Sequence, residues 1–189
     1  MGNVLLKILD WSEVWALLIP LLVLQFRRHQ DLLMKPVIVY VWLGFLINIA
    51  IDAIMTINIY FPNNYLGNNP LYNIHSVVRF TCFSIYFLQV QGNAFKRVKK
   101  MLALVSVLFL VINFPFFENF FNYNSLSGNL LATEAYLLLI CCMLYYLAEL
   151  KSDRDDLFNT PHFWVVTGLG SYVVINFFVF LFYIPIIDV

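Results

Sequence analysis

Charged residues are scarce in this 189-residue sequence, in which Asp, Glu, Lys and Arg together make up 12%. Soluble domains carry about 25% charged residues, and this chain is 62% hydrophobic with a mean hydropathy of +0.81. The formal net charge is zero, and no long basic or acidic tail indicates a nucleic-acid partner. The composition therefore predicts an integral membrane protein whose main partner is the lipid bilayer.

Cysteine and histidine are also few, with three of each. Cys82, Cys141 and Cys142 all lie in apolar segments, which argues against a disulfide framework. The histidines fall at different depths of the predicted topology, so a three-histidine metal site is not expected. The sequence also lacks the H-E-x-x-H, G-x-S-x-G, P-loop and dinucleotide-binding motifs. We predict a protein that is not an enzyme, with no catalytic residues, no metal and no cofactor.

Six segments are long and apolar enough to be membrane spans, since a span needs about 20 mostly apolar residues. We place them near residues 11–27, 36–61, 71–92, 101–118, 127–149 and 162–187. Glu13 interrupts the first apolar run and no small-residue cleavage site follows, so we expect this span to be retained and not removed as a signal peptide. The predicted fold is all-α: one domain over residues 1–189, a polytopic transmembrane helix bundle.

Basic residues are concentrated in the loops on one side of this predicted bundle. The loops at 27–35, 93–100 and 150–161 carry nine Lys and Arg residues, whereas those at 62–70 and 119–126 carry none. The positive-inside rule assigns the basic loops to the cytoplasm. With six spans, both the N-terminus and the C-terminus are then predicted outside.

Polar side chains recur at three- and four-residue steps within the spans, which places them on one face of each helix. Three of them, Asp52, Arg79 and Glu134, are charged at neutral pH. A charge inside a bilayer costs about 2.5–3.5 kcal/mol on insertion scales, so such residues usually face the protein interior. Counting residues from the outer helix ends puts all three in one layer. We predict that Asp52 contacts Arg79, with Glu134 within reach of both.

This layer is the predicted ligand- or ion-binding site, and it lies in the outer half of the bilayer. Its residues are Asp52, Arg79, Glu134, His75, Asn48, Asn176 and Tyr72. Two carboxylates against one guanidinium leave an excess negative charge that a proton, a cation, a histidine or water must compensate. This imbalance favours a water-accessible cavity, and the alternative is an ion pair that only orients two helices.

Three stretches resemble small bacterial membrane proteins with six to seven spans, relatives of which sometimes accompany sensor histidine kinases. The stretches are NPLYNIHSVVRF at 69–80, the basic turn KRVKK at 96–100 and TPHFWVVTG at 160–168. The resemblance implies the bacterial cytoplasmic (inner) membrane and a membrane or cytoplasmic signalling protein as partner. The sequence differs from that pattern in having Arg79 where an acidic residue is expected, and in stopping where a seventh span is expected.

Taken together, these features predict an integral membrane sensor or partner-binding module with an outward-facing polar cavity. The alternative is a proton- or cation-linked channel or transporter subunit, in which Asp52 and Glu134 would provide the coupling. An intramembrane enzyme is the third hypothesis. Assembly into a homo-oligomer is left open.

Overall fold

The computed structural model describes residues 12–26, 31–60, 67–90, 94–123, 126–151 and 157–187. Both chain termini and the basic residues Arg27, Arg28 and Arg154 lie outside these described residues. Every secondary-structure element in the described chain is a helix, and the elements are α2 (Ser12–Phe26), η1 (Leu32–Met34), α3 (Lys35–Tyr60), α4 (Asn69–Val90), α5 (Lys96–Phe116), α6 (Gly128–Leu150), η3 (Leu157–Asn159) and α7 (Pro161–Ile187). The predicted all-α class is confirmed for this part of the chain.

Each segment predicted as a span is a helix, with most boundaries within three residues of the prediction. The largest difference is at α5, which begins at Lys96 and not at residue 101. Lys and Arg are good helix formers, so the basic turn belongs to the first turns of the helix. Phe95 precedes it with a left-handed backbone, φ 51°. The Lys151 ammonium lies 5.3 Å from the centre of the Phe95 ring.

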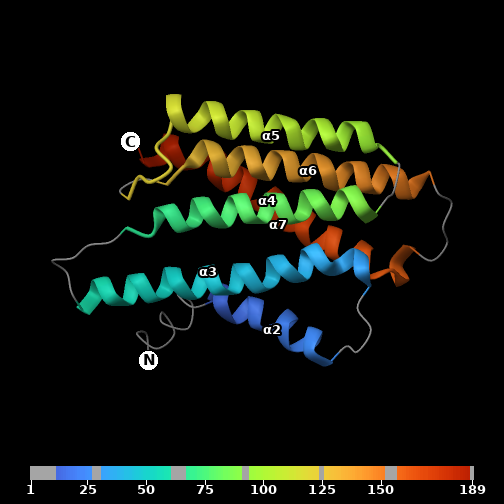
Figure 1. Ribbon diagram of the computed structural model, residues 1–189, viewed down its shortest axis with the longest axis horizontal. Coiled ribbons are helices and arrows are strands. Elements are labelled where there is room, and N and C mark those ends of the chain that lie inside the picture. Colours follow the sequence, from blue (N-terminus) through green and yellow to red (C-terminus); the bar gives the residue numbers. More distant parts are fainter. Residues whose placement is uncertain are drawn as a thin grey trace.

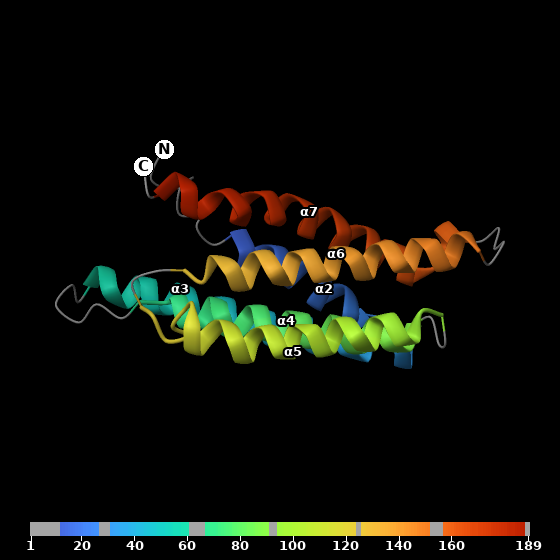
Figure 2. The same cartoon turned by 90° about the horizontal axis from the view of Figure 1, so that it is seen from above.

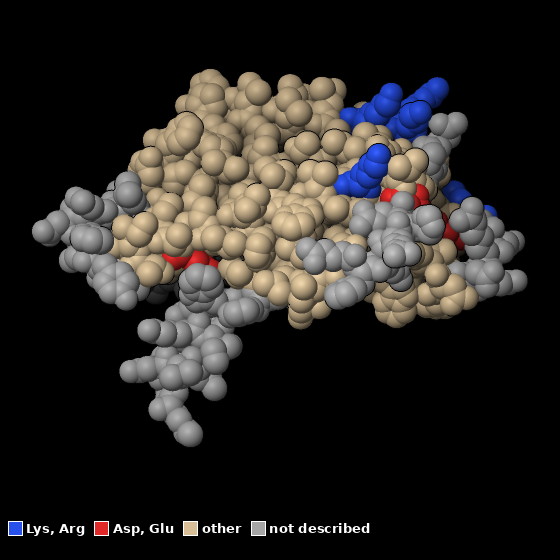
Figure 3. Space-filling view, turned by 60° about the horizontal axis from the view of Figure 1, so that its bottom comes forward, with Lys and Arg blue, Asp and Glu red and all other residues tan. Residues whose placement is uncertain are grey.

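By length and composition, three of the described helices could cross a membrane. They are Leu32–Ile57, Lys96–Phe116 and Gly128–Leu150, with mean hydropathies of 2.2, 1.8 and 1.9. The exposed surface of α5 is strongly apolar, since Met101, Leu104 and Val111 are each about 60% exposed. Figure 3 shows a broad band of the surface without charged side chains. These features indicate a membrane protein.

The long helices run side by side, and α4 lies at the centre of the bundle (Figures 1 and 2). α4 packs against α3, α5 and α6, while α6 packs most extensively against α7 and α2 packs against α3. The aromatic and aliphatic core lies between the second half of α4, α6 and the first half of α7. It contains Phe83, Tyr86, Phe87, Leu138, Cys142, Tyr145, Val166, Leu169 and Val173.

The segment that joins α5 to α6 is held against the start of α4. Asn69 and Asn73 donate side-chain hydrogen bonds to the carbonyl oxygens of Tyr123 and Phe120, at 2.9 and 2.8 Å. Gly67 lies so close to this segment that an added Cβ would be 2.2 Å from the Tyr123 carbonyl oxygen. A side chain at residue 67 therefore does not fit, and the contact fixes one end of the bundle.

The opposite end of the bundle is basic. In the described chain, Lys35, Lys96, Arg97, Lys100 and Lys151 all lie where α3 and α5 begin and α6 ends, and we call this the basic end. Figure 3 shows its blue side chains gathered together. Lys99 is buried there and donates a 2.8 Å hydrogen bond to the Phe87 carbonyl oxygen in the last turn of α4. A cation at that position complements the negative end of the helix dipole.

Candidate functional site

The polar stripe of α4 faces the protein interior, as its spacing predicts. Asn73, Ser76 and Arg79 follow at three-residue steps and are 0%, 1% and 6% exposed. His75 is also buried. A helix with this many buried polar groups must find partners on its neighbours, because an unsatisfied polar group in an apolar environment is costly.

Arg79 forms a buried, two-pronged ion pair with Glu134 of α6. The Nε of Arg79 donates to one carboxylate oxygen, and Nη2 donates to the other at 2.6 Å. Ser76 donates a third hydrogen bond to the carboxylate at 2.5 Å. Two parallel charge-assisted bonds fix the relative orientation of guanidinium and carboxylate. The pair therefore connects the middle of α4 to the first half of α6.

Arg79 also connects α4 to α7. Its Nη1 donates a 2.5 Å hydrogen bond to the Tyr172 hydroxyl, and its guanidinium carbon lies 5.0 Å from the centre of the Tyr172 ring. We did not predict Tyr172 as a site residue. The available signal was its position one turn before Asn176 on the polar face of the last predicted span.

His75 contacts α3 through Tyr40, another residue that sequence reasoning missed. The two rings are stacked with centres 5.8 Å apart and planes 12° apart, and the Tyr40 hydroxyl lies 3.4 Å from His75 Nε2. A Cβ on Gly44 would approach the same nitrogen to 3.3 Å. The glycine therefore gives the imidazole room against α3. The signal in the sequence was the four-residue spacing of Tyr40, Gly44 and Asn48.

The ion pair predicted for Asp52 and Arg79 is replaced by the pair between Arg79 and Glu134. The reason is the register of α3 against α4. The Tyr40 ring lies between His75 and Phe83, so α3 passes the Arg79 level at residues 40–44. Asp52 is eight to twelve residues further along α3, which is about 12–18 Å at 1.5 Å per residue. α3 extends past the start of α4, as Figure 1 shows.

A cavity of about 690 Å³ lies beside this cluster, between α2, α3, α4, α6 and α7. Five of the seven predicted site residues line it, and they are Arg79, His75, Asn48, Asn176 and Tyr72. Tyr40, Tyr172 and Asn69 add further polar groups to its wall. Glu134 is behind Arg79, and Asp52 is not among the lining residues. The structure thus brings together six predicted residues, counting Glu134 through its ion pair.

The charge of this cavity is balanced. Among the described lining residues, Arg79 carries the single fixed charge, and Glu134 neutralises it. The predicted excess of negative charge is absent from this cluster because Asp52 lies elsewhere on α3. A guanidinium has five N–H donors, and three of those of Arg79 are used by Glu134 and Tyr172. Such a wall can bind a small polar molecule that is uncharged or net neutral and offers hydrogen-bond acceptors.

A second polar network links three elements at the basic end. The Tyr86 hydroxyl lies 3.1 Å from His162 Nδ1, and His162 Nε2 lies 3.1 Å from an Asp31 carboxylate oxygen. The backbone N–H of Leu33, and after it His162, hold the pKa of the exposed Asp31 below its ordinary value of 3.8. This network attaches the start of α7 to α4 and to the residues before α3. Within the described residues, no cluster of three or more His, Cys, Asp and Glu is placed to hold a metal ion.

Comparisons of the chain with family models, with curated proteins and with solved structures find no match. The functional interpretation therefore depends on the geometry of the cavity and its ion pair. The resemblance to small bacterial membrane proteins stays a prediction.

Proposed function

We propose that the chain is an integral membrane sensor or partner-binding module that binds a small polar ligand in the cavity beside Arg79. The observation that carries this proposal is the cavity of about 690 Å³, lined by five residues whose spacing along the sequence had predicted a binding site. Its volume lies within the usual range of small-molecule sites, about 300–1,000 Å³. A balanced ion pair in the wall suits a net-neutral ligand.

The proposed topology has six spans, with the basic end in the cytoplasm and both termini outside. The distribution of described Lys residues supports it, because Lys35, Lys96 and Lys151 lie at one end and the cavity reaches Asn69 at the other. The cavity then belongs to the outer half of the bilayer. The resemblance to bacterial proteins suggests the inner membrane and a signalling protein as the partner at the basic end.

A binding event in this cavity has a physical route to the cytoplasmic side. Arg79 of α4 contacts α6 through Glu134 and α7 through Tyr172. A ligand that competes for Tyr172 or for the remaining N–H groups of Arg79 therefore changes the contacts between α4, α6 and α7. Ligand binding shifts a conformational equilibrium only through such differential contacts. α7 continues back from Tyr172 to His162, which belongs to the network at the basic end.

Cavity filling tests the binding proposal. Gly168 lines the cavity, and an added Cβ there would meet no atom within 4 Å, so Gly168→Phe should occupy the cavity while leaving the ion pair intact. We expect some members of a panel of uncharged and zwitterionic metabolites to raise the unfolding temperature of the wild type in nanodiscs, but not that of Gly168→Phe. Equal stabilisation of both proteins would contradict binding in this cavity.

Flux measurements separate this proposal from a proton- or cation-linked channel or transporter subunit. That alternative has less support, because Glu134 is held by Arg79 and Ser76 and because Asp52 does not line the cavity. We expect liposomes that contain the wild type to leak protons and K⁺ no faster than empty liposomes. Flux that the wild type conducts and Glu134→Gln loses would favour the transporter and reject the sensor.

A further inference from the structure

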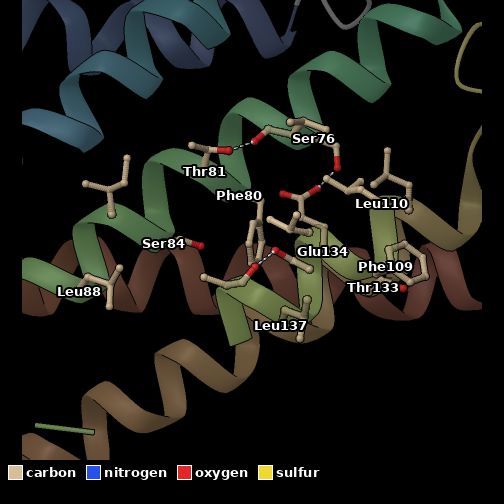
Figure 4. Close-up of a pocket in the computed structure, with 16 residues that line it drawn as sticks. Ser76, Phe80, Thr81, Ser84, Leu88, Phe109, Leu110, Thr133, Glu134 and Leu137 are labelled. Atoms are coloured by element: carbon tan, nitrogen blue, oxygen red, sulfur yellow. Dashed lines mark hydrogen bonds between the residues drawn. The ribbon is translucent and has the colours of Figure 1, made fainter. Parts of the chain in front are cut away.

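A second, smaller pocket lies on the other side of the ion pair, between α4, α5 and α6. Its volume is about 230 Å³. Apolar side chains such as Phe80, Leu110 and Leu137 form most of its wall, and Figure 4 shows them around Glu134. Ser76 lines both this pocket and the larger cavity, so the ion pair separates the two spaces.

Two of the hydroxyl groups in the wall of this pocket are used within their own helices. Thr81 donates a 2.8 Å hydrogen bond to the Val77 carbonyl oxygen, and Ser106 donates one of 2.8 Å to the Ala103 carbonyl oxygen, an arrangement common for Ser and Thr in helices. Ser84 and Thr133 add two further hydroxyl groups to a wall that is otherwise mostly apolar. The pocket offers a ligand mainly hydrocarbon surface.

Glu134 is the charged residue among those that line the pocket, and its carboxylate has an acceptor position left. Two carboxylate oxygens provide about four lone-pair positions. Three hydrogen bonds from described residues use three of them, two from Arg79 and one from Ser76. A donor that reached the fourth would form a charge-assisted bond, roughly twice as strong as a neutral one. The pocket thus combines an apolar wall with one strong acceptor.

The pocket lies next to the apolar outer surface of the bundle. Ile85 of α4 and Val107 of α5 both line it and are 42% and 56% exposed. The neighbouring surface of α5 is apolar and contains Leu104, Leu108 and Val111. In a chain that spans the membrane, this surface contacts lipid, so a molecule would reach the pocket from the hydrocarbon layer and not from water.

We infer that this pocket binds an uncharged, membrane-soluble molecule of the phenol class, with its ring against the apolar wall and its hydroxyl donating to Glu134. The size fits, since an apolar cavity of about 150 Å³ accommodates benzene and this pocket holds about 230 Å³. A hydroxyl supplies the one donor that Glu134 can still accept. The inference does not depend on the ligand of the larger cavity.

A pair of probes that differ in one hydrogen-bond donor tests this inference. We would titrate 4-ethylphenol and 4-ethylanisole into the wild type in nanodiscs, with empty nanodiscs as the reference for partition into lipid. Because a hydrogen bond to a charged group contributes about 1.5–3 kcal/mol, we expect the phenol to bind at least about tenfold more tightly than its methyl ether. Equal affinities, or no binding above the reference, would overturn the inference.

Filling variants locate the bound phenol. Ala103→Phe places a ring in the pocket, whereas Val111→Phe places it on the exposed surface of the same helix. We expect the first substitution to abolish phenol binding and the second to leave it unchanged. Gly168→Phe, which fills the larger cavity, should also leave it unchanged. Loss of phenol binding in Gly168→Phe would place the probe in the larger cavity and reject the second site. If Ala103→Phe does not fold, the comparison of 4-ethylphenol with 4-ethylanisole in the wild type still decides the inference.

Discussion

The Arg79–Glu134 pair has opposite energetic consequences depending on whether one partner or both are removed. Both side chains are almost fully buried, at 7% and 2% exposure. Desolvation of two ions offsets most of their mutual attraction, so an apolar pair of similar size is often nearly neutral in stability. A single substitution is different, because the charge left behind is buried and has lost its oppositely charged partner.

We expect Arg79→Met to lower the free energy of unfolding by about 3–5 kcal/mol and Arg79→Met/Glu134→Leu to recover much of this loss. Glu134→Leu completes the double-mutant cycle. Denaturant unfolding in mixed micelles supplies the four free energies, and their combination gives the coupling between the two residues. Additive effects of the two single substitutions would contradict the buried pair.

Two glycines provide a matched comparison of close approach and open space. An added Cβ would be 2.2 Å from the Tyr123 carbonyl oxygen at Gly67 and would meet nothing within 4 Å at Gly168. We expect Gly67→Ala to destabilise the protein by about 1–3 kcal/mol through forced displacement. In contrast, we expect Gly168→Ala to stabilise it by about 0.4–1 kcal/mol, since alanine restricts the unfolded chain. Thermal unfolding midpoints that shift in the same direction for both variants would refute this contrast.

At the level of helices, periodicity predicted which face of α4 is buried, but counting did not predict how α3 lies beside it. The three-residue spacing of Asn73, Ser76 and Arg79 reflects the pitch of one helix, which sequence contains directly. The register of two helices depends on their packed side chains, here Tyr40 against His75. Counting from the loop between α3 and α4 assumes that the end of α3 lies level with the start of α4. In the structure, α3 extends past the start of α4.

Counting also favoured the wrong partner for Arg79. It put Asp52 and Glu134 in the same layer, and only the packing of α4 against α6 decides between them. Tyr172 was not predicted as a site residue, although it shares the polar face of the last predicted span with Asn176. Its hydroxyl becomes a site group only through the length of the Arg79 side chain.

Cysteine cross-linking distinguishes the observed register from the counted one. We expect Gly44→Cys with His75→Cys to be joined by a short bifunctional thiol reagent, because a Cβ at residue 44 would be 3.3 Å from the imidazole. Asp52→Cys with His75→Cys should not react, since residue 52 lies about 12 Å further along α3. Both pairs are placed in a background without the three native cysteines. Cross-linking of the second pair alone would support the counted register.

Across the whole molecule, the basic end, the aromatic core and the cavity have different positions along the long axis. The aromatic core lies toward the basic end, and the 690 Å³ cavity extends alongside it to Asn69 at the other end. Phe83 and Leu169 belong to the core and also line the cavity. By the positive-inside rule, we expect the basic end to lie on the cytoplasmic side of a membrane.

This arrangement predicts which residues a reagent can reach in intact cells. Tyr123 lies beyond the cavity end and is 50% exposed, while Lys100 is exposed at the basic end. We expect a membrane-impermeant maleimide to label Tyr123→Cys in intact cells and Lys100→Cys only after permeabilisation. Val111→Cys, on the exposed apolar surface of α5, serves as the control and should react poorly in both conditions because a thiol in lipid rarely ionises. Labelling of Lys100→Cys first would invert the topology, and the cavity would then open toward the cytoplasm.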